Sequence, residues 1–185
     1  MARVFYTGKG DKGVSYFGSK KIEKDSPEVE TVGALDELNS LLGIVKNQKI
    51  PTSSKKILEE IQQDLFIIQA HIGCLLTGWN PPEFKEEKIR KLEEMIDTLE
   101  QKVKPERKFV VYGQDEISAW LDFARAVARR AELKFFILNK KLASKKKKLP
   151  PELGAYLNRL SSFLYAMARF STKTNKKKEK HPSYR

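Results

Sequence analysis

The sequence predicts an all-α fold, an up-and-down bundle of five helices that follows a non-helical N-terminal arm of about 26 residues. Five segments place apolar residues three and four positions apart, which is the spacing of one helix face. Proline, glycine or lysine clusters separate these segments, and no segment alternates convincingly as a strand would. We therefore expect one domain over residues 1–185, made of the arm (1–26), the helical bundle (27–173) and a lysine-rich tail (174–185).

The first two predicted helices have clear ends. One is expected over residues 27–46, because Ser26 is a suitable N-cap and Pro27 fits the first helical position. The other follows Pro51 and ends at Gly78, where Gly-Trp-Asn-Pro-Pro is a strong stop signal. Their apolar faces contain Val29, Val32, Leu35, Leu38, Leu42 and Val45 in the first helix, and Leu58, Ile61, Leu65, Ile68, Ile72 and Leu75 in the second.

Three further helices follow the same spacing. The third spans about residues 89–103 and has a heavily charged outer face. The fourth starts near Asp115, and the fifth follows Pro150 and Pro151. Their apolar faces contain Ile89, Leu92, Ile96, Leu99 and Val103; then Ile117, Leu121, Ala124, Ala128, Ala131 and Phe135; then Leu153, Leu157, Leu160, Leu164 and Met167.

The net charge of +12 is concentrated in the C-terminal part of the chain. Residues 134–185 contain 15 Lys and Arg residues and two acidic residues, a net charge of +13. Most of the excess lies in two lysine runs, residues 145–148 and 176–178. Such runs bind nucleic-acid phosphates in some proteins, and in others they form a solvated loop or a frayed terminus. Because no aromatic residue interrupts either run to stack on a base, we favour the loop and the frayed terminus.

Several classes of protein are excluded by composition. A single cysteine, Cys74, excludes a disulfide framework and a cysteine-based zinc site. Neither Glu-x-x-His nor His-x-x-x-His occurs, so we expect no di-iron centre and no other protein-bound metal. His71 is expected to be a packed histidine rather than a ligand. Apolar runs are far shorter than the ~18–20 residues of a membrane span, and no targeting segment is evident, so we expect a cytoplasmic protein.

The arm contains a glycine cluster at Gly8, Gly10 and Gly13 with the spacing G-x-G-x-x-G. It is not a dinucleotide fingerprint, because a helix does not follow it and no βαβ unit surrounds it. Backbone N–H groups of such a cluster can approach an anion closely. The segment adds polar side chains from Thr7, Lys9, Asp11, Lys12 and Ser15. An anion-binding arm and a flexible leader with glycine turns fit this composition equally well.

The fourth predicted helix carries an arginine cluster. A helical projection places Arg125, Arg129 and Glu132 on one polar seam beside the apolar face, with Arg130 on the opposite shoulder. Two arginines one turn apart suit a polyphosphate or a carboxylate, although salt-bridged arginines on a helix surface fit the same pattern. Similar border positions are held by Asp36 and Asn39 in the first helix and by Asn158, Ser161 and Tyr165 in the fifth.

Six motifs, taken in order, closely resemble the PduO-type ATP:cob(I)alamin adenosyltransferases. They lie at residues 6–13, 24–27, 33–40, 61–66, 125–132 and 156–161, and the resemblance extends to about residue 172. It implies a ferritin-like bundle that assembles as a homotrimer, with ATP bound between neighbouring subunits. It also implies an enzyme that uses Mg²⁺ and transfers the 5′-deoxyadenosyl group of ATP to the cobalt of reduced cob(I)alamin or another corrinoid, releasing triphosphate.

The resemblance also implies roles for individual residues. Catalysis would depend on Arg129, Lys24, Asp36 and Arg125, with Arg125 pairing with Asp36 across the subunit interface. Phe109 would lie beneath the corrin ring and keep the lower cobalt ligand away. Here the loop at residues 109–114 departs from the family pattern Phe-x-x-Pro-Gly-Gly. The ATP-binding residues implied are Thr7, Gly8, Lys9, Gly10, Asp11, Gly13, Ser15, Lys24, Arg129, Arg130, Glu132 and Asn158.

The implied partners are ATP, the corrinoid, two further copies of the chain and an electron-donating reductase. Neither nucleic acid nor membrane is expected. The alternative to the enzyme is a non-catalytic bundle that binds ATP or nucleic acid and has lost the chemistry.

Overall fold

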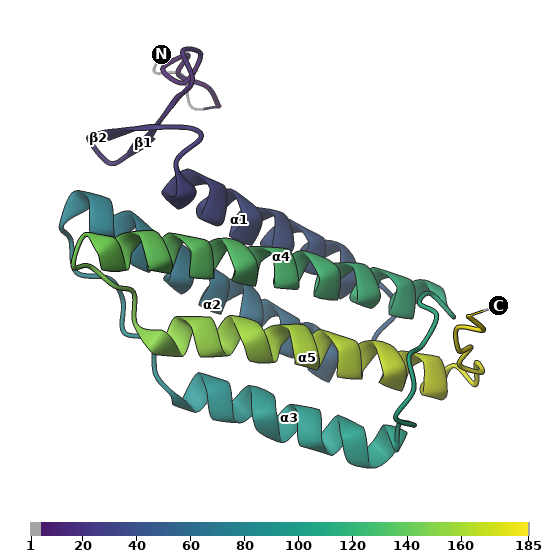
Figure 1. Cartoon of the computed structure of the whole chain (residues 1–185). Coiled ribbons are helices and arrows are strands. Elements are labelled where there is room, and N and C mark those ends of the chain that lie inside the picture. Colours follow the sequence, from purple (N-terminus) through teal and green to yellow (C-terminus); the bar gives the residue numbers. More distant parts are fainter. Residues whose placement is uncertain (1–4, 185) are drawn as a thin grey trace.

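The computed structural model describes residues 5–184, and these form five helices and one two-stranded hairpin (Figure 1). The five-helix all-α class is therefore confirmed. Residues 1–4 of the arm and Arg185 of the tail lie outside the described residues. The elements are β1 (Val14–Phe17), β2 (Lys20–Glu23), α1 (Pro27–Lys46), α2 (Thr52–Thr77), α3 (Glu87–Val103), α4 (Glu116–Ser144) and α5 (Pro151–Thr174).

The helix ends follow from local side-chain chemistry. The Ser26 hydroxyl accepts the Val29 N–H at 3.3 Å, which caps α1, and Gly78 ends α2. A capping box begins α4: the Asp115 carboxylate accepts the Ser118 N–H, and the Asp115 N–H donates to the Ser118 hydroxyl, both at 3.0 Å. These caps satisfy backbone groups that the helix itself leaves unpaired.

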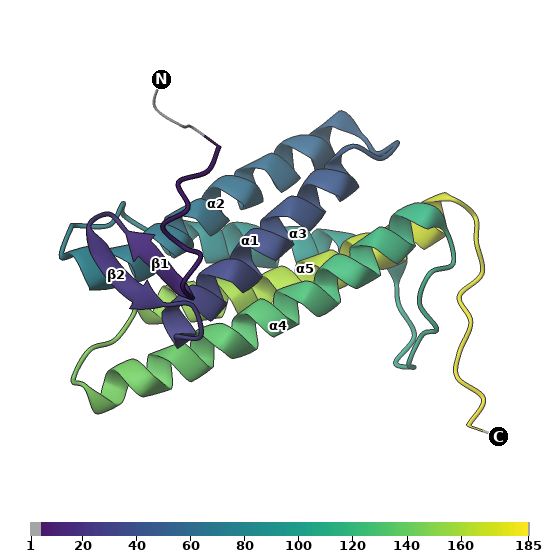
Figure 2. The same cartoon turned by 90° about the horizontal axis from the view of Figure 1, so that it is seen from above.

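The helices pack side by side in the order α2, α1, α4, α5, α3 (Figures 1 and 2). One continuous apolar core joins all five helices, and its central side chains are fully buried: Leu35, Leu42, Leu65, Ile72, Leu138, Leu157 and Leu164. Burial of this surface is the main source of stability in such a bundle. Within the described residues, no helix offers the length of apolar surface that a membrane crossing requires.

The hairpin is a feature that the sequence analysis did not predict. β1 and β2 pair antiparallel, with Val14 opposite Glu23 and Phe17 opposite Lys20. Phe17 lies against Gly73 of α2, where a Cβ would come within 3.3 Å of its ring, so the hairpin rests on the end of α2. The expectation of no strands is therefore wrong. The strands give little signal in the sequence, because each has only four residues and a single strand residue, Val14, is buried.

The two lysine runs lie at opposite ends of the bundle, since one follows α4 and the other follows α5 (Figure 1). Their side chains are exposed, as expected. The tail, however, runs beside the loop that precedes α4 (Figure 2). The Val111 N–H donates to the Lys180 carbonyl at 2.8 Å, and the His181 Nδ1 lies 2.9 Å from the Phe109 carbonyl oxygen. The expectation of a frayed terminus is therefore wrong for residues 179–181.

Candidate functional site

A pocket of about 650 Å³ opens at the end of the bundle where α3 ends and α4 begins. The segment from α3 to α4 forms one wall, and α4 and α5 form the others. Several residues singled out in the sequence line this pocket: Phe109, Arg125, Arg129, Ser161 and Tyr165. Phe109 is 76% exposed, so its ring is available to a ligand. A large exposed aromatic beside two arginines can bind a ligand with both a flat apolar part and an anionic part.

Arg125 is held against the pocket wall by an aromatic ring. Its guanidinium lies 4.8 Å from the centre of the Tyr112 ring, a cation–π contact. The Arg125 Nε is buried and has no hydrogen-bond partner among the described residues. The sequence analysis missed Tyr112; an aromatic residue in the loop just before the arginine helix was the available signal.

The polar seam predicted on α4 faces α5. The Asn158 amide donates to the Glu132 carboxylate at 2.8 Å, so these two predicted residues meet directly. Arg130 points to the other side of the helix, where it forms an exposed ion pair with Glu37 of α1. The predicted separation of Arg130 from Arg125 and Arg129 is therefore confirmed. The role of each residue in binding remains a proposal.

The glycine arm folds into two tight turns. Asp11 donates its N–H to the Gly8 carbonyl at 3.3 Å, and Gly13 donates to the Gly10 carbonyl at 3.2 Å. Gly8 and Gly13 have φ values of 70° and 76°, a region that glycine adopts without strain. Most residues of these turns are exposed, so their backbone is accessible to a ligand, and glycine-rich turns of this kind can bind anions.

Lys24 is brought to this glycine segment by the hairpin. Its N–H donates to the Gly13 carbonyl at 2.9 Å, and its Nζ lies 3.3 Å from the position that a Cβ on Gly10 would occupy. A side chain at position 10 would therefore press on the Lys24 ammonium and on the Val14 carbonyl oxygen. The structure thus places a cation beside the glycine turns, as the predicted anion-binding arm requires.

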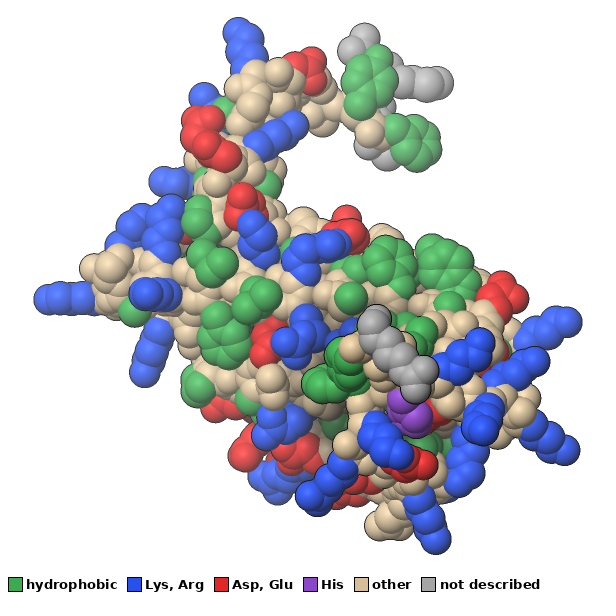
Figure 3. All heavy atoms as spheres, turned by 45° about the vertical axis from the view of Figure 1, so that its right-hand side comes forward, with side chains coloured by type: hydrophobic (Ala, Val, Ile, Leu, Met, Phe, Trp, Pro, Cys, Tyr) green, Lys and Arg blue, Asp and Glu red, His purple; other side chains and the backbone are tan. Residues whose placement is uncertain are grey.

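The arm and the pocket do not meet within one chain. The part of the arm before the hairpin stands away from the bundle as a hook (Figure 3), and no described residue of the arm lines the pocket. Asp36 is exposed on α1. Within the described chain, the Arg125 guanidinium contacts the Tyr112 ring rather than the Asp36 carboxylate. The predicted nucleotide residues therefore form two groups on one chain, one at the arm and one along α4 and α5, with Arg130 apart from both on the α1 side of α4.

The described residues contain no group of three or more His, Cys, Asp and Glu side chains that could hold a metal ion. His71 is packed, as expected: it is 8% exposed, and its Nε2 lies 2.9 Å from the Pro82 carbonyl oxygen. Burial lowers the pKa of His71, although the hydrogen bond to Pro82 partly opposes this shift.

A buried ion pair beneath the pocket was also missed. Arg169 of α5 and Asp122 of α4 lie 2.5 Å apart, and Arg169 also lines the pocket. Burial raises the pKa of Asp122, because desolvation outweighs the charge of Arg169 beside it. A charged residue of each sign within the apolar stretches of neighbouring helices was the signal that could have revealed the pair.

Residues 5–171 match the family model for cobalamin adenosyltransferase. This chain belongs to the cobalamin adenosyltransferase family. As a member, it is 35% identical over 169 residues to the corrinoid adenosyltransferase PduO of Citrobacter freundii, a match that covers 90% of this chain and 49% of that protein. The chain thus spans about half the length of the PduO relatives it matches. A shorter corrinoid adenosyltransferase of Citrobacter freundii is 33% identical and is covered over 97% of its length, against 94% of this chain.

Solved structures support the same assignment for this family member. A variant of the PduO-type ATP:corrinoid adenosyltransferase from Lactobacillus reuteri, complexed with cobalamin and ATP, superposes with a TM-score of 0.86. It is 28% identical, and the match covers 97% of both chains. Another variant of that enzyme, complexed with ATP, gives a TM-score of 0.82 at 29% identity and covers 96% of this chain and 99% of that one. The five-helix bundle is therefore the fold of this family.

Proposed function

We propose that this protein transfers the 5′-deoxyadenosyl group of ATP to the cobalt of a reduced corrinoid and releases triphosphate. The observation that carries the proposal is the pocket in which the exposed Phe109 ring lies beside Arg125 and Arg129, in a chain of this family. One pocket thereby offers an apolar surface for a corrin ring and cations for a polyphosphate. Cobalt(I) is itself the nucleophile, so the protein needs no nucleophilic side chain.

The nucleotide part of the proposal assigns the triphosphate to cations and backbone amides. The glycine turns would bind phosphate oxygens through N–H groups, and Lys24 beside Gly10 would add an ammonium. Arg129, exposed at the pocket, would reach the same triphosphate from a helix. As the C5′–O bond of ATP breaks, negative charge increases on the leaving triphosphate, and fixed donors aimed at that charge lower the barrier.

The corrinoid part assigns Phe109 to the lower face of the corrin ring. Its 76% exposed ring would be covered by a flat apolar ligand. An apolar ring at that place would exclude a lower axial ligand from cobalt. Four-coordinate cobalt(II) is easier to reduce than cobalt(II) that carries such a ligand, so Phe109 would tune a metal that the protein itself does not bind.

Mg²⁺ is part of the proposal as a partner of the ATP phosphates. This ion is commonly held by one or two carboxylates together with substrate phosphates, so a dedicated protein cage is not required. Asp11 fits this need, because its exposed carboxylate lies within the glycine turns, 3.6 Å from the position of a Cβ on Gly8. Mg²⁺ held there with the phosphates would help to neutralise the triphosphate.

We further propose a homotrimer with composite sites, in which the arm of one subunit completes the pocket of its neighbour. Two observations support this. The arm and the pocket are separate on one chain, and α4 exposes a row of large apolar side chains on one face: Phe123, Leu133 and Ile137. In such an assembly Asp36 would pair with Arg125 of the next subunit. We assign the protein to the cytoplasm, where a reductase could keep the corrinoid reduced.

The proposed activity is tested by incubating the purified protein with ATP, Mg²⁺ and chemically reduced cobalamin under anaerobic conditions. We expect the cob(I)alamin absorption to be replaced by the spectrum of an alkylcobalamin, together with one triphosphate per cobalamin converted. Omitting ATP is the control and should give no change. A folded protein that leaves the spectrum unchanged in the complete mixture would contradict the proposal.

A further inference from the structure

The ion pair between Arg169 and Asp122 is unusual for its burial. The Arg169 side chain is 2% exposed and the Asp122 side chain is 4% exposed, and the Nη2 and Oδ2 atoms lie 2.5 Å apart. Buried ion pairs lose much hydration, and apolar residues of similar size often stabilise a fold equally well. Stability alone therefore does not account for this pair, and its neighbours indicate what else it does.

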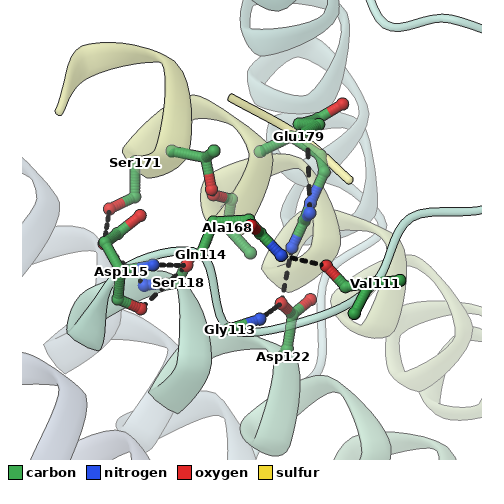
Figure 4. Close-up of polar contacts among 11 residues, drawn as sticks. Val111, Gly113, Gln114, Asp115, Ser118, Asp122, Ala168, Ser171 and Glu179 are labelled. Atoms are coloured by element: carbon green, nitrogen blue, oxygen red, sulfur yellow. Dashed lines mark hydrogen bonds and ion pairs between the residues drawn. The ribbon is translucent and has the colours of Figure 1, made fainter. Parts of the chain in front are cut away.

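The pair contacts the loop at residues 109–114, hereafter the 109–114 loop. Asp122 accepts the Gly113 N–H at 3.4 Å on the same oxygen that binds Arg169. Tyr112, the residue before Gly113, stacks on Arg125 in the pocket. The carboxylate of Asp122 thus links a buried cation to the loop that carries Phe109 (Figure 4).

The same guanidinium also contacts the tail. Glu179 of the tail forms a second ion pair with Arg169, with its Oε1 3.6 Å from Nη1 (Figure 4). The next two residues pair with the loop: the Lys180 carbonyl accepts the Val111 N–H, and the His181 ring meets the Phe109 carbonyl. Loop and tail therefore lie together: the tail contacts Arg169 directly through Glu179, and the loop contacts its ion-pair partner Asp122. The Tyr165 ring, 5.1 Å from the guanidinium, completes its surroundings on the pocket side.

We propose that Arg169 is a positioning residue for the corrinoid half of the site: its buried guanidinium holds the 109–114 loop through Asp122 and the tail through Glu179. This inference rests on the proposed role of Phe109 at the corrin face. Arg169 sets where the Phe109 ring lies. It has no part in holding the glycine arm, which lies at the opposite end of the helical bundle (Figure 1). Loss of the pair therefore weakens corrinoid binding and leaves ATP binding unchanged.

The sharpest test replaces both partners with apolar residues, because removal of one partner would leave an unpaired buried charge. We expect the Asp122→Leu/Arg169→Met variant to melt close to the wild type, since apolar replacements of buried pairs are often neutral. Its KM for corrinoid should rise by about tenfold or more, because small misplacements of binding groups are costly. Its KM for ATP should stay within about twofold of the wild-type value.

Limited trypsin digestion reports on the loop without any assay of activity. Arg107 and Lys108 directly precede the loop, and cleavage after them can be mapped by mass spectrometry. In the double variant this cleavage should be faster by about fivefold or more, because the loop opens more often. Lys88→Met is a control for the loss of an ion pair elsewhere: it removes the 2.5 Å contact to Asp64 in another part of the bundle and should leave cleavage of the loop unchanged.

Two conservative variants keep the test decisive if the double variant does not fold. Arg169→Lys retains the positive charge beside Asp122 and should keep the loop protected, whereas Asp122→Asn removes the charge at nearly constant shape and should expose it. Wild-type loop cleavage and wild-type corrinoid KM in Asp122→Asn would overturn the proposal, as would an equal rise in the KM for ATP. If the wild-type protein itself did not adenosylate corrinoid, only the proposed function would fail, because the cleavage result tests the loop contact by itself.

Discussion

Substitution of Arg129 is the most direct way to distinguish a catalytic site from a site that only binds ATP. It is exposed at the pocket, and the neighbouring Arg130 already pairs with Glu37, so Arg129 is the arginine available to a ligand. We expect Arg129→Ala to lower kcat by roughly 10²–10³-fold, which is the usual effect of removing one donor that stabilises developing charge. Helicity, followed by circular dichroism, should not change.

The matched control for Arg129→Ala is Lys134→Ala. Lys134 lies on the same helix and forms a partly exposed ion pair with Glu30, away from the pocket. Exposed ion pairs contribute little to stability, so this variant should behave as the wild type in both rate and melting. A near-normal rate in Arg129→Ala would remove Arg129 from the phosphate site.

His71 predicts a pH dependence of stability. Because burial lowers its pKa below the ordinary value of 6.5, the folded protein binds fewer protons than the unfolded chain as the pH falls through 6.5. The contribution of neutral His71 to the free energy of unfolding is then fully present above pH 6.5, and it is lost as the pH falls below that value. We expect His71→Gln, which keeps a donor for the Pro82 carbonyl, to flatten this decrease in melting temperature measured from pH 7.5 to about pH 5.5.

The second histidine supplies the comparison for this pH experiment. His181 is exposed in the tail, and His181→Gln is measured in parallel because it removes the other histidine of the chain. Identical profiles for the wild type and His71→Gln would show that His71 does not contribute to the pH dependence.

At the scale of single elements, the start of α4 is held more firmly than a simple helix cap would require. Asp115 receives the Ser118 N–H and, at 2.9 Å, the Ser171 hydroxyl of α5. Burial acts to raise its pKa, but these donors together outweigh it, and the pKa of Asp115 is lowered. The same carboxylate therefore caps α4 and joins it to α5 beside the 109–114 loop.

We expect Asp115→Ala to lower the free energy of unfolding by about 1–3 kcal/mol, because it removes a cap and an interhelical hydrogen bond. In a chain of this size each kcal/mol lowers the melting temperature by about 2–4 °C, which calorimetry can measure. Ser26→Ala removes a cap with one bond of 3.3 Å and should cost less, about 1 kcal/mol. Equal losses in the two variants would mean that the contact of Asp115 with α5 does not stabilise the protein.

The helices could be predicted from the sequence because each carries its own signals. Ser26, Gly78 and Asp115 mark ends through local capping, and the three-and-four spacing sets the buried faces. The hairpin was missed because its four-residue strands bury little, although the two-residue connection that begins at Gly18 is itself a hairpin signal. Local patterns thus predict elements well only when those elements are long.

The candidate site likewise contains residues that a local sequence pattern predicts and contacts that it does not. Arg125 and Arg129 could be placed on one seam from helical periodicity alone. The Asp122–Arg169 pair and the contact of Phe109 with His181 join residues 47 and 72 positions apart, so no local pattern encodes them. The backbone pairing of Val111 with Lys180 does not depend on side-chain type, and a lysine run gives no indication of it. These contacts follow from how the helices bring distant segments together.

At the scale of the whole molecule, the arrangement of the chain argues for assembly. The N-terminal segment that carries the glycine turns stands out from the helices (Figures 1 and 3), and the pocket with Arg129 is lined by no described residue of that segment. A polyphosphate contacting both groups needs a second chain, and the apolar face of α4 offers a surface that a second chain could cover. Composite sites of this kind predict that two inactive variants can restore each other.

We expect this complementation between Lys24→Ala and Arg129→Ala. Each variant alone should be inactive, but in a cyclic trimer every mixed assembly contains one site with an intact Lys24 from one subunit and an intact Arg129 from its neighbour. Random mixing by co-expression should therefore give about a quarter of the wild-type activity. In the matched control the Lys24→Ala/Arg129→Ala double variant is mixed equally with wild type. Composite sites then leave about a quarter of the activity, whereas sites within one chain leave about half and give no rescue in the first mixture.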